Sequence, residues 1–149
     1  AYEIRNCDWS SDVCSSDLPL PTRDLDIVPC ANPDNLDRLH ALLERLDAIV
    51  RQPGARDLPV RRAWLDGAGQ LLLRTSLGPL DLLLRLHDGR GYAELLDRSI
   101  ELEAEGLRVR LIDLPALVEI KAGTGRVRDR LSVPVLVALL EARERGTSE

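Results

Sequence analysis

The chain carries three aspartates inside segments that otherwise have the apolar character of buried strands. Asp24 and Asp26 are separated by one residue in TRDLDIV, and Asp81 stands among leucines in LGPLDLLLRL. Because successive side chains of a strand alternate between its two faces, Asp24 and Asp26 are predicted to project from the same face. Two carboxylates this close repel each other, which raises the pKa of at least one of them unless a cation lies between them.

If the two strands are neighbours, the three carboxylates predict a cation site. Carboxylate oxygens suit Mg²⁺ or Mn²⁺, which often bind through a few carboxylates together with substrate phosphates. Without a cation the three acids repel, so Asp81→Asn is expected not to destabilise the metal-free fold. The alternative is an edge strand with a polar side, on which Asp81 pairs with an arginine.

The elements that must position these residues follow from periodicity and turn signals. Asn32 and Pro33 are a plausible helix start, and the leucine spacing that follows predicts a helix continuing to Val50. The segment 61–76 is predicted to form two strands joined by a turn at 66–69, and a further strand is expected over 79–88.

The second half of the chain is expected to alternate in the same way. A short helix or irregular turn over 89–98 should precede a hairpin over 99–112. Helices are predicted over 114–122, with Asp113 as N-cap, and over 132–145. We therefore expect an α+β or α/β fold with a mixed sheet flanked by helices.

Residues 1–18 differ from the remainder of the chain. Residues 8–18 and 1–4 back-translate, in one frame, into sequences that resemble the two parts of a short-read sequencing adapter around its index. We interpret 1–18 as a non-native, adapter-derived tail on a truncated gene and exclude it from fold reasoning. The domain is then expected to cover 19–149.

Composition adds little about partners. With 1–18 set aside, Cys30 is the only cysteine, so neither a disulfide framework nor a cysteine metal site is expected. Arginine use is heavy, Lys121 is the only lysine and methionine is absent, which suggests a GC-rich bacterial gene whose native start is missing. No apolar run reaches the ~20 residues of a membrane span, so a cytoplasmic protein without membrane contact is expected.

The order of the segments resembles the DNA polymerase β-type nucleotidyltransferase superfamily. TRDLDIVP, a helix, two strands and LGPLDLLLRL match its Asp-x-Asp strand and the neighbouring strand with a third Asp. The later stretch, with Gly91-Tyr92, a hairpin, Lys121 and then Arg126 to Asp129, resembles small bacterial members such as the toxin nucleotidyltransferases of abortive-infection systems.

The resemblance implies a role for each matching residue. Asp24, Asp26 and Asp81 would be metal ligands, with Asp81 also activating the acceptor hydroxyl, and Lys121 would contact the triphosphate. The implied reaction moves NMP from an NTP to an acceptor that the sequence does not identify: tRNA, a protein or a small molecule. An antitoxin is a candidate partner. Lys121 could equally be a surface residue of a helix whose stem lies along apolar neighbours.

One family feature is absent, and two other functions compete. The Gly-Gly or Gly-Ser turn that holds phosphates before the Asp-x-Asp would fall in 1–18, so weak or no activity is expected of this form of the chain. A non-catalytic binding module or toxin–antitoxin partner with the same fold is one alternative. A haloacid-dehalogenase-like phosphatase is the other, but the chain has no downstream acidic pair of the kind that family needs.

Overall fold

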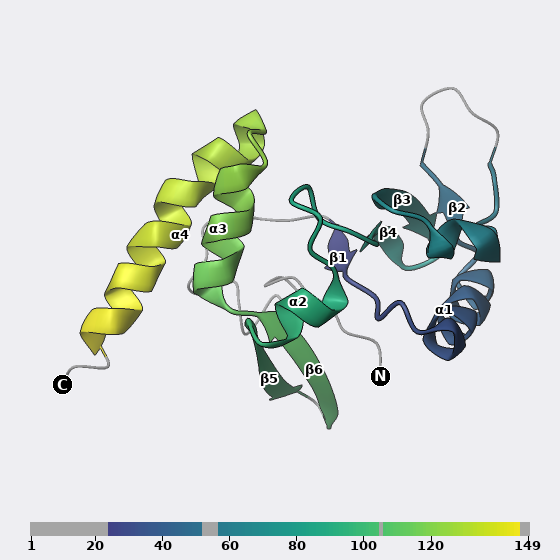
Figure 1. The fold of residues 1–149 in the computed structure, drawn as a ribbon, viewed down its shortest axis with the longest axis horizontal. Coiled ribbons are helices and arrows are strands. Elements are labelled where there is room, and N and C mark those ends of the chain that lie inside the picture. Colours follow the sequence, from purple (N-terminus) through teal and green to yellow (C-terminus); the bar gives the residue numbers. More distant parts are fainter. Residues whose placement is uncertain (1–23, 52–56, 105, 147–149) are drawn as a thin grey trace. The chain divides into compact units, whose positions relative to one another are not determined.

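The computed structural model describes residues 24–51, 57–104 and 106–146. The tail interpreted as adapter, 1–18, lies outside these ranges. The chain divides into two compact units, 1–111 and 112–149. Helices and strands occur together with a mixed sheet, so the fold is α+β, as expected (Figure 1).

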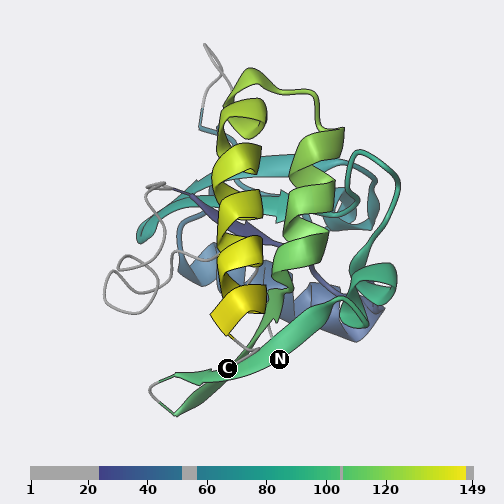
Figure 2. The same cartoon turned by 90° about the vertical axis from the view of Figure 1, so that its left-hand side faces the viewer.

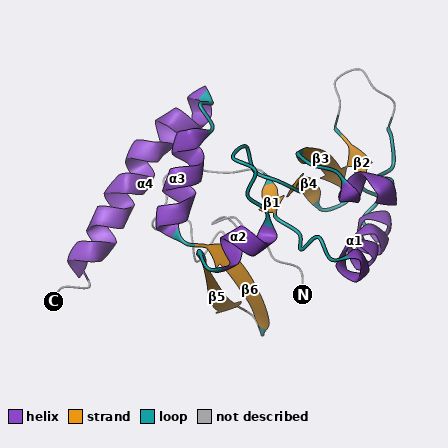
Figure 3. Cartoon of the chain, viewed as in Figure 1, coloured by secondary structure: helices purple, strands orange, loops and turns teal. Residues whose placement is uncertain are grey.

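The first unit is built on a four-stranded sheet with the strand order β1-β4-β3-β2. Its strands are β1 (Leu25–Ile27), β2 (Ile49–Val50), β3 (Gln70–Thr75) and β4 (Gly78–Leu83). β1 runs parallel to β4, whereas β2, β3 and β4 are antiparallel to their neighbours. Figure 3 shows these strands beside the helix α1 (Pro33–Arg45).

The hydrophobic core of this unit lies between α1 and one face of the sheet, called here the core face. One cluster joins leucines of the helix to apolar residues of β1, β3 and β4. Its most deeply buried members are Leu36, Leu39, Leu43, Leu73 and Leu82. The periodicity of α1 therefore places the leucine stripe against the alternate residues of the strands.

The first helix ends earlier than the leucine spacing predicts. α1 stops at Arg45, and Ile49–Val50 form β2 instead of a last helical turn. Asp47 has φ of 50°, and the Ala48 N–H returns to the Leu43 carbonyl at 2.9 Å, which closes the helix as a C-terminal turn. Ile49 and Val50 then pair with β3, where branched side chains pack well.

The predicted strand pair over 61–76 is wrong in its first half. Residues Arg62–Asp66 form a 3₁₀ helix, η1, and only Gln70–Thr75 form a strand. The contacts of Arg62 favour the 3₁₀ helix over a strand. Its guanidinium donates to Asp66, four residues further along the chain, and to Asp37 of α1. Leu65 is buried in the core, so tertiary contacts favour the helical turn.

The short helix and the hairpin that end the first unit follow the sequence prediction closely. A short helix, α2 (Tyr92–Leu96), precedes the hairpin of β5 (Ser99–Ala104) and β6 (Leu107–Ile112). β4 is shorter than predicted because the N–H groups of Leu84 and Arg85 both turn to the Gly69 carbonyl.

The second unit consists of two helices that lie side by side, α3 (Leu114–Gly123) and α4 (Val127–Gly146) (Figure 2). Asp113 caps α3 as predicted, accepting from the Ala116 N–H at 2.6 Å. α4 begins five residues before the predicted Ser132, so Pro134 lies inside it. Pro134 and Arg130 are both exposed, which lets water satisfy the carbonyl that loses its helical donor. Of the helices in the described ranges, none has the length and apolar character of a membrane span.

Candidate active site on the charged face of the sheet

The sheet register places Asp26 directly beside Asp81. These two residues are Cα partners on the parallel strands β1 and β4, and partners in a parallel pair project to the same face. Their neighbours Ile27 and Leu82 are also partners and are buried in the core, so the two aspartates belong to the opposite face. The sheet therefore brings Asp26 and Asp81 side by side on adjacent strands, the neighbour relation on which the predicted cation site depends.

Two further residues complete a row across the sheet on this side. Leu72 is the β3 partner of Asp81, and the Arg51 N–H donates to the Leu72 carbonyl at 2.8 Å. We call the side of the sheet that bears Arg51, Leu72, Asp81 and Asp26 the charged face. The row begins at Arg51, the residue that follows β2, and crosses β3 and β4 to β1.

Arg51 pairs with Asp81. Its Nη2 atom donates to Asp81 Oδ1, although β3 lies between the two backbones. The Asp81 side chain is 13% exposed and that of Arg51 is 34% exposed, so the contact is largely withdrawn from water. An arginine partner for Asp81 was the alternative to a metal site in the sequence analysis, and the structure supplies one.

The sequence analysis did not identify Arg51 as a site residue. The helix predicted to continue to Val50 leaves Arg51 just beyond its end, where nothing relates the arginine side chain to Asp81. The signal was the pair of β-branched residues Ile49 and Val50, which favour a strand over a last helical turn. A strand there, paired with LLLR, would have placed Arg51 on the face of Asp81.

Asp24 directly precedes β1 and is half-buried. In the described ranges, no group of three or more His, Cys, Asp or Glu side chains comes close enough together to hold a metal ion. The donor set still fits a magnesium-type ion, because such ions commonly use one or two protein carboxylates and complete their shell with phosphates and water. Asp26 and Asp81 are oxygen donors of that kind on one face.

Lys121, the remaining predicted site residue, belongs to the second unit. It lies near the end of α3, where its Nζ is 3.6 Å from Asp129 Oδ1 of α4. Asp129 also accepts a hydrogen bond from the Thr124 hydroxyl. These contacts connect the end of α3 to the beginning of α4, which gives Lys121 a structural role within its own unit.

The turn that contains Gly91-Tyr92 holds two carboxylates with altered pKa values. The Gly91 N–H donates to Glu94 at 2.9 Å and lowers the pKa of that carboxyl. Asp88 accepts from Arg90 Nε at 2.8 Å and from the Arg90 N–H at 3.0 Å, and these bonds lower the pKa of Asp88. Both carboxylates therefore serve the turn and the start of α2.

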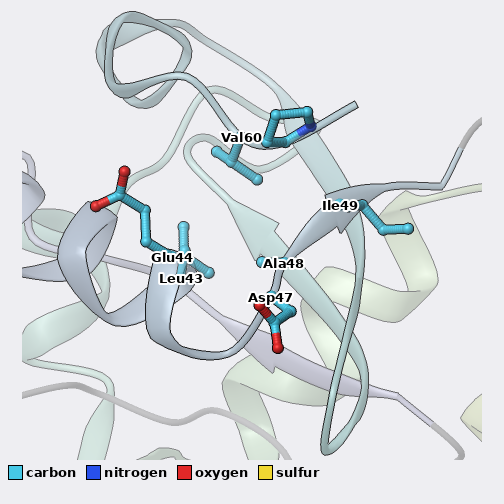
Figure 4. A pocket seen from close by; sticks show the side chains of 7 residues that line it. Leu43, Glu44, Asp47, Ala48, Ile49 and Val60 are labelled. Carbon is cyan, nitrogen blue, oxygen red and sulfur yellow. The ribbon is translucent and has the colours of Figure 1, made fainter. Parts of the chain in front are cut away.

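A shallow pocket of about 280 Å³ lies at the end of α1 (Figure 4). Its lining is an apolar surface with two exposed carboxylates, made by Leu43, Glu44, Asp47, Ala48, Ile49, Pro59 and Val60. None of the predicted site residues lines it, so the pocket and the charged row are separate features.

Comparison of the chain with models of known protein families and with curated protein sequences found no match.

Proposed function

We propose that the chain is a metal-dependent nucleotidyltransferase of the DNA polymerase β type, similar to the small bacterial toxin enzymes. The observation that supports this most is the pairing of Asp26 with Asp81 on adjacent parallel strands. An Asp-x-Asp strand beside a strand with a third Asp is the arrangement that the resemblance implies. The ligand would be an NTP with Mg²⁺ or Mn²⁺.

In this proposal the carboxylates of Asp26 and Asp81, partners on one face of the sheet, would hold a divalent cation, and Asp24 would be the further ligand that the resemblance implies. Bound cations would neutralise the phosphate oxygens and make the acceptor hydroxyl more acidic. Asp81 would accept the proton of that hydroxyl as its oxygen bonds to the α-phosphorus. The bond from the α-phosphorus to the bridging oxygen then breaks, and pyrophosphate leaves with its electron pair.

A second candidate is a binding module that has this fold and no activity. It is favoured by the ion pairs that engage two of the predicted site residues, Asp81 with Arg51 and Lys121 with Asp129. In such a module these pairs would be permanent parts of the structure. An antitoxin or another protein would then be the partner, in place of an acceptor substrate.

Nucleotide binding and transfer separate the two candidates. The protein is mixed with each α-labelled NTP and Mn²⁺, and then with tRNA, bacterial protein extract or a hydroxyl-bearing small molecule. We expect Mn²⁺-dependent NTP binding and only weak release of pyrophosphate from this form of the chain, both lost in Asp26→Asn and Asp81→Asn. Asp57→Asn is the matched control, because Asp57 is exposed and pairs with Arg74 outside the row.

Two results would count against the enzyme. One is an NTP affinity that is the same with and without Mn²⁺. The other is pyrophosphate release that is as fast in Asp81→Asn as in the wild type. Binding of NTP without any transfer, unaffected by Asp81→Asn, would favour the non-catalytic module.

A further inference from the structure

Arg51 is held in place by the sheet and by Asp81 together. Its backbone N–H is fixed on the Leu72 carbonyl, and neighbouring strands are about 4.8 Å apart, so the side chain must extend over β3 to reach β4. An arginine stem is long enough for this and is apolar along most of its length. The guanidinium at the end of the side chain therefore lies against the Asp81 carboxylate, which is predicted to hold a cation.

The guanidinium is not fully satisfied in this position. Among the described residues, the Nε atom of Arg51 is buried and has no hydrogen-bond partner. Arg62, by contrast, donates from Nε, Nη1 and Nη2 to Asp37, Asp66 and the Pro33 carbonyl. A buried donor without a partner weakens the state that contains it, so the Arg51–Asp81 pair is less firmly held than a complete fork would be.

The Arg51 guanidinium would compete with a divalent cation for the carboxylate of Asp81. Asp81 Oδ1 accepts from Arg51, and a bound cation would bring two positive charges to within a few ångströms of a third. Each occupant therefore weakens the binding of the other.

We infer that Arg51 is the resident counter-ion of Asp81 and lowers the affinity of the charged face for divalent cations until it is displaced. The inference rests on the proposed function for the identity of the ligand. Arg51 is a positioning residue in this scheme: it acts on Asp81 and has no contact with the reacting atoms. While the pair is intact, Asp81 holds a cation less tightly.

The test measures cation binding without nucleotide. Mn²⁺ is titrated into the wild type, Arg51→Gln and Arg51→Lys by calorimetry, and thermal unfolding is followed in parallel. Removing the competing charge is expected to tighten Mn²⁺ binding by about tenfold in Arg51→Gln. Arg51→Lys keeps the charge and should remain near the wild type. The tighter binding should vanish in the double variant Arg51→Gln/Asp81→Asn.

Arg74→Gln is the matched control. Arg74 also lies in the sheet and forms an ion pair, with Asp57 at 3.1 Å, but both side chains are well exposed. Its Mn²⁺ affinity should stay within about twofold of the wild type, since an exposed charge is screened by solvent.

If Arg51→Gln does not fold, the wild type still decides the matter. The arginine Nε–H signals of the labelled protein are recorded by NMR with and without Mg²⁺, and the Arg51 signal should shift as the pair opens. An unmoved Arg51 signal under saturating Mg²⁺ would overturn the inference. So would Mn²⁺ binding to Arg51→Gln that is no tighter than to the wild type, although the proposed function would survive that result. Absence of Mn²⁺ binding in every variant would contradict both.

Discussion

The two faces of the four-stranded sheet obtain stability from different interactions. On the core face, side chains such as Leu73 and Leu82 are fully buried against α1. On the charged face, the row contains a half-exposed leucine and an ion pair whose arginine Nε has no hydrogen-bond partner among the described residues. The stability of the core face therefore comes from buried apolar area, whereas the stability of the charged face depends on the positive charge beside Asp81.

The largest expected effect is on the core face. Leu82→Ala should reduce the free energy of unfolding by ~2–5 kcal/mol, because the side chain is fully buried and leaves a cavity. Leu72→Ala, on the other face and 39% exposed, should cost less than ~1 kcal/mol. Urea denaturation measures the free energy of unfolding of both variants. An equal loss of stability in the two would show that the charged face is packed as tightly as the core.

An intermediate effect is expected for the ion pair. In metal-free buffer, Asp81→Asn should lose about 1–2 kcal/mol, because it leaves the Arg51 charge without its partner in a largely buried position. The sequence alone predicted no loss, and the Arg51 contact reverses that expectation. A double-mutant cycle with Arg51→Gln should give a coupling of about 0.5–2 kcal/mol. Purely additive losses would show that the pair contributes nothing.

A smaller effect is expected where an ion pair is exposed. Arg74→Gln should change the free energy of unfolding by no more than ~0.5 kcal/mol, since the Arg74 and Asp57 side chains are 60% and 74% exposed. The same urea experiment, repeated at low and high salt, checks this. A loss as large as that of Asp81→Asn would remove the distinction between the buried and the exposed pair.

The smallest effect concerns pH. Bonds from Arg90 lower the pKa of Asp88 below its ordinary value of 3.8, so the charged form stabilises the fold. The wild type should therefore be slightly more stable than Asp88→Asn at pH 6, by at most ~0.5 kcal/mol. That difference should shrink as the pH falls below 3.8 toward the lowered pKa. Denaturation curves at several pH values measure it, and a difference that grows toward acid would contradict the assignment.

The sequence predicted the fold class and the strand positions of Asp26 and Asp81 for a simple physical reason. Both depend on local patterns of apolar residues, whereas the pairing of β1 with β4 is a long-range contact that local alternation does not determine. Arg51 and η1 could not be predicted in the same way. The leucine spacing of α1 continues through Leu46 to Val50, and only the turn at Asp47 and the pairing with β3 end it. Likewise, η1 depends on the contact of Arg62 with Asp37, a residue of another element.

The parallel pairing of β1 with β4 has a consequence for the order of folding. β2, β3 and β4 are antiparallel neighbours, and β3 and β4 are joined by a tight turn, so they can associate as a local unit. β1 pairs with β4, and α1, β2, η1 and β3 lie between these two strands in the chain. Closing so long a loop loses entropy before the strand contacts can form. The short edge strand β1 should therefore join last, and its amide hydrogens should exchange with solvent sooner than those of β3. Because Asp26 arrives with β1, the nascent chain acquires its paired carboxylates only when the rest of the sheet is complete.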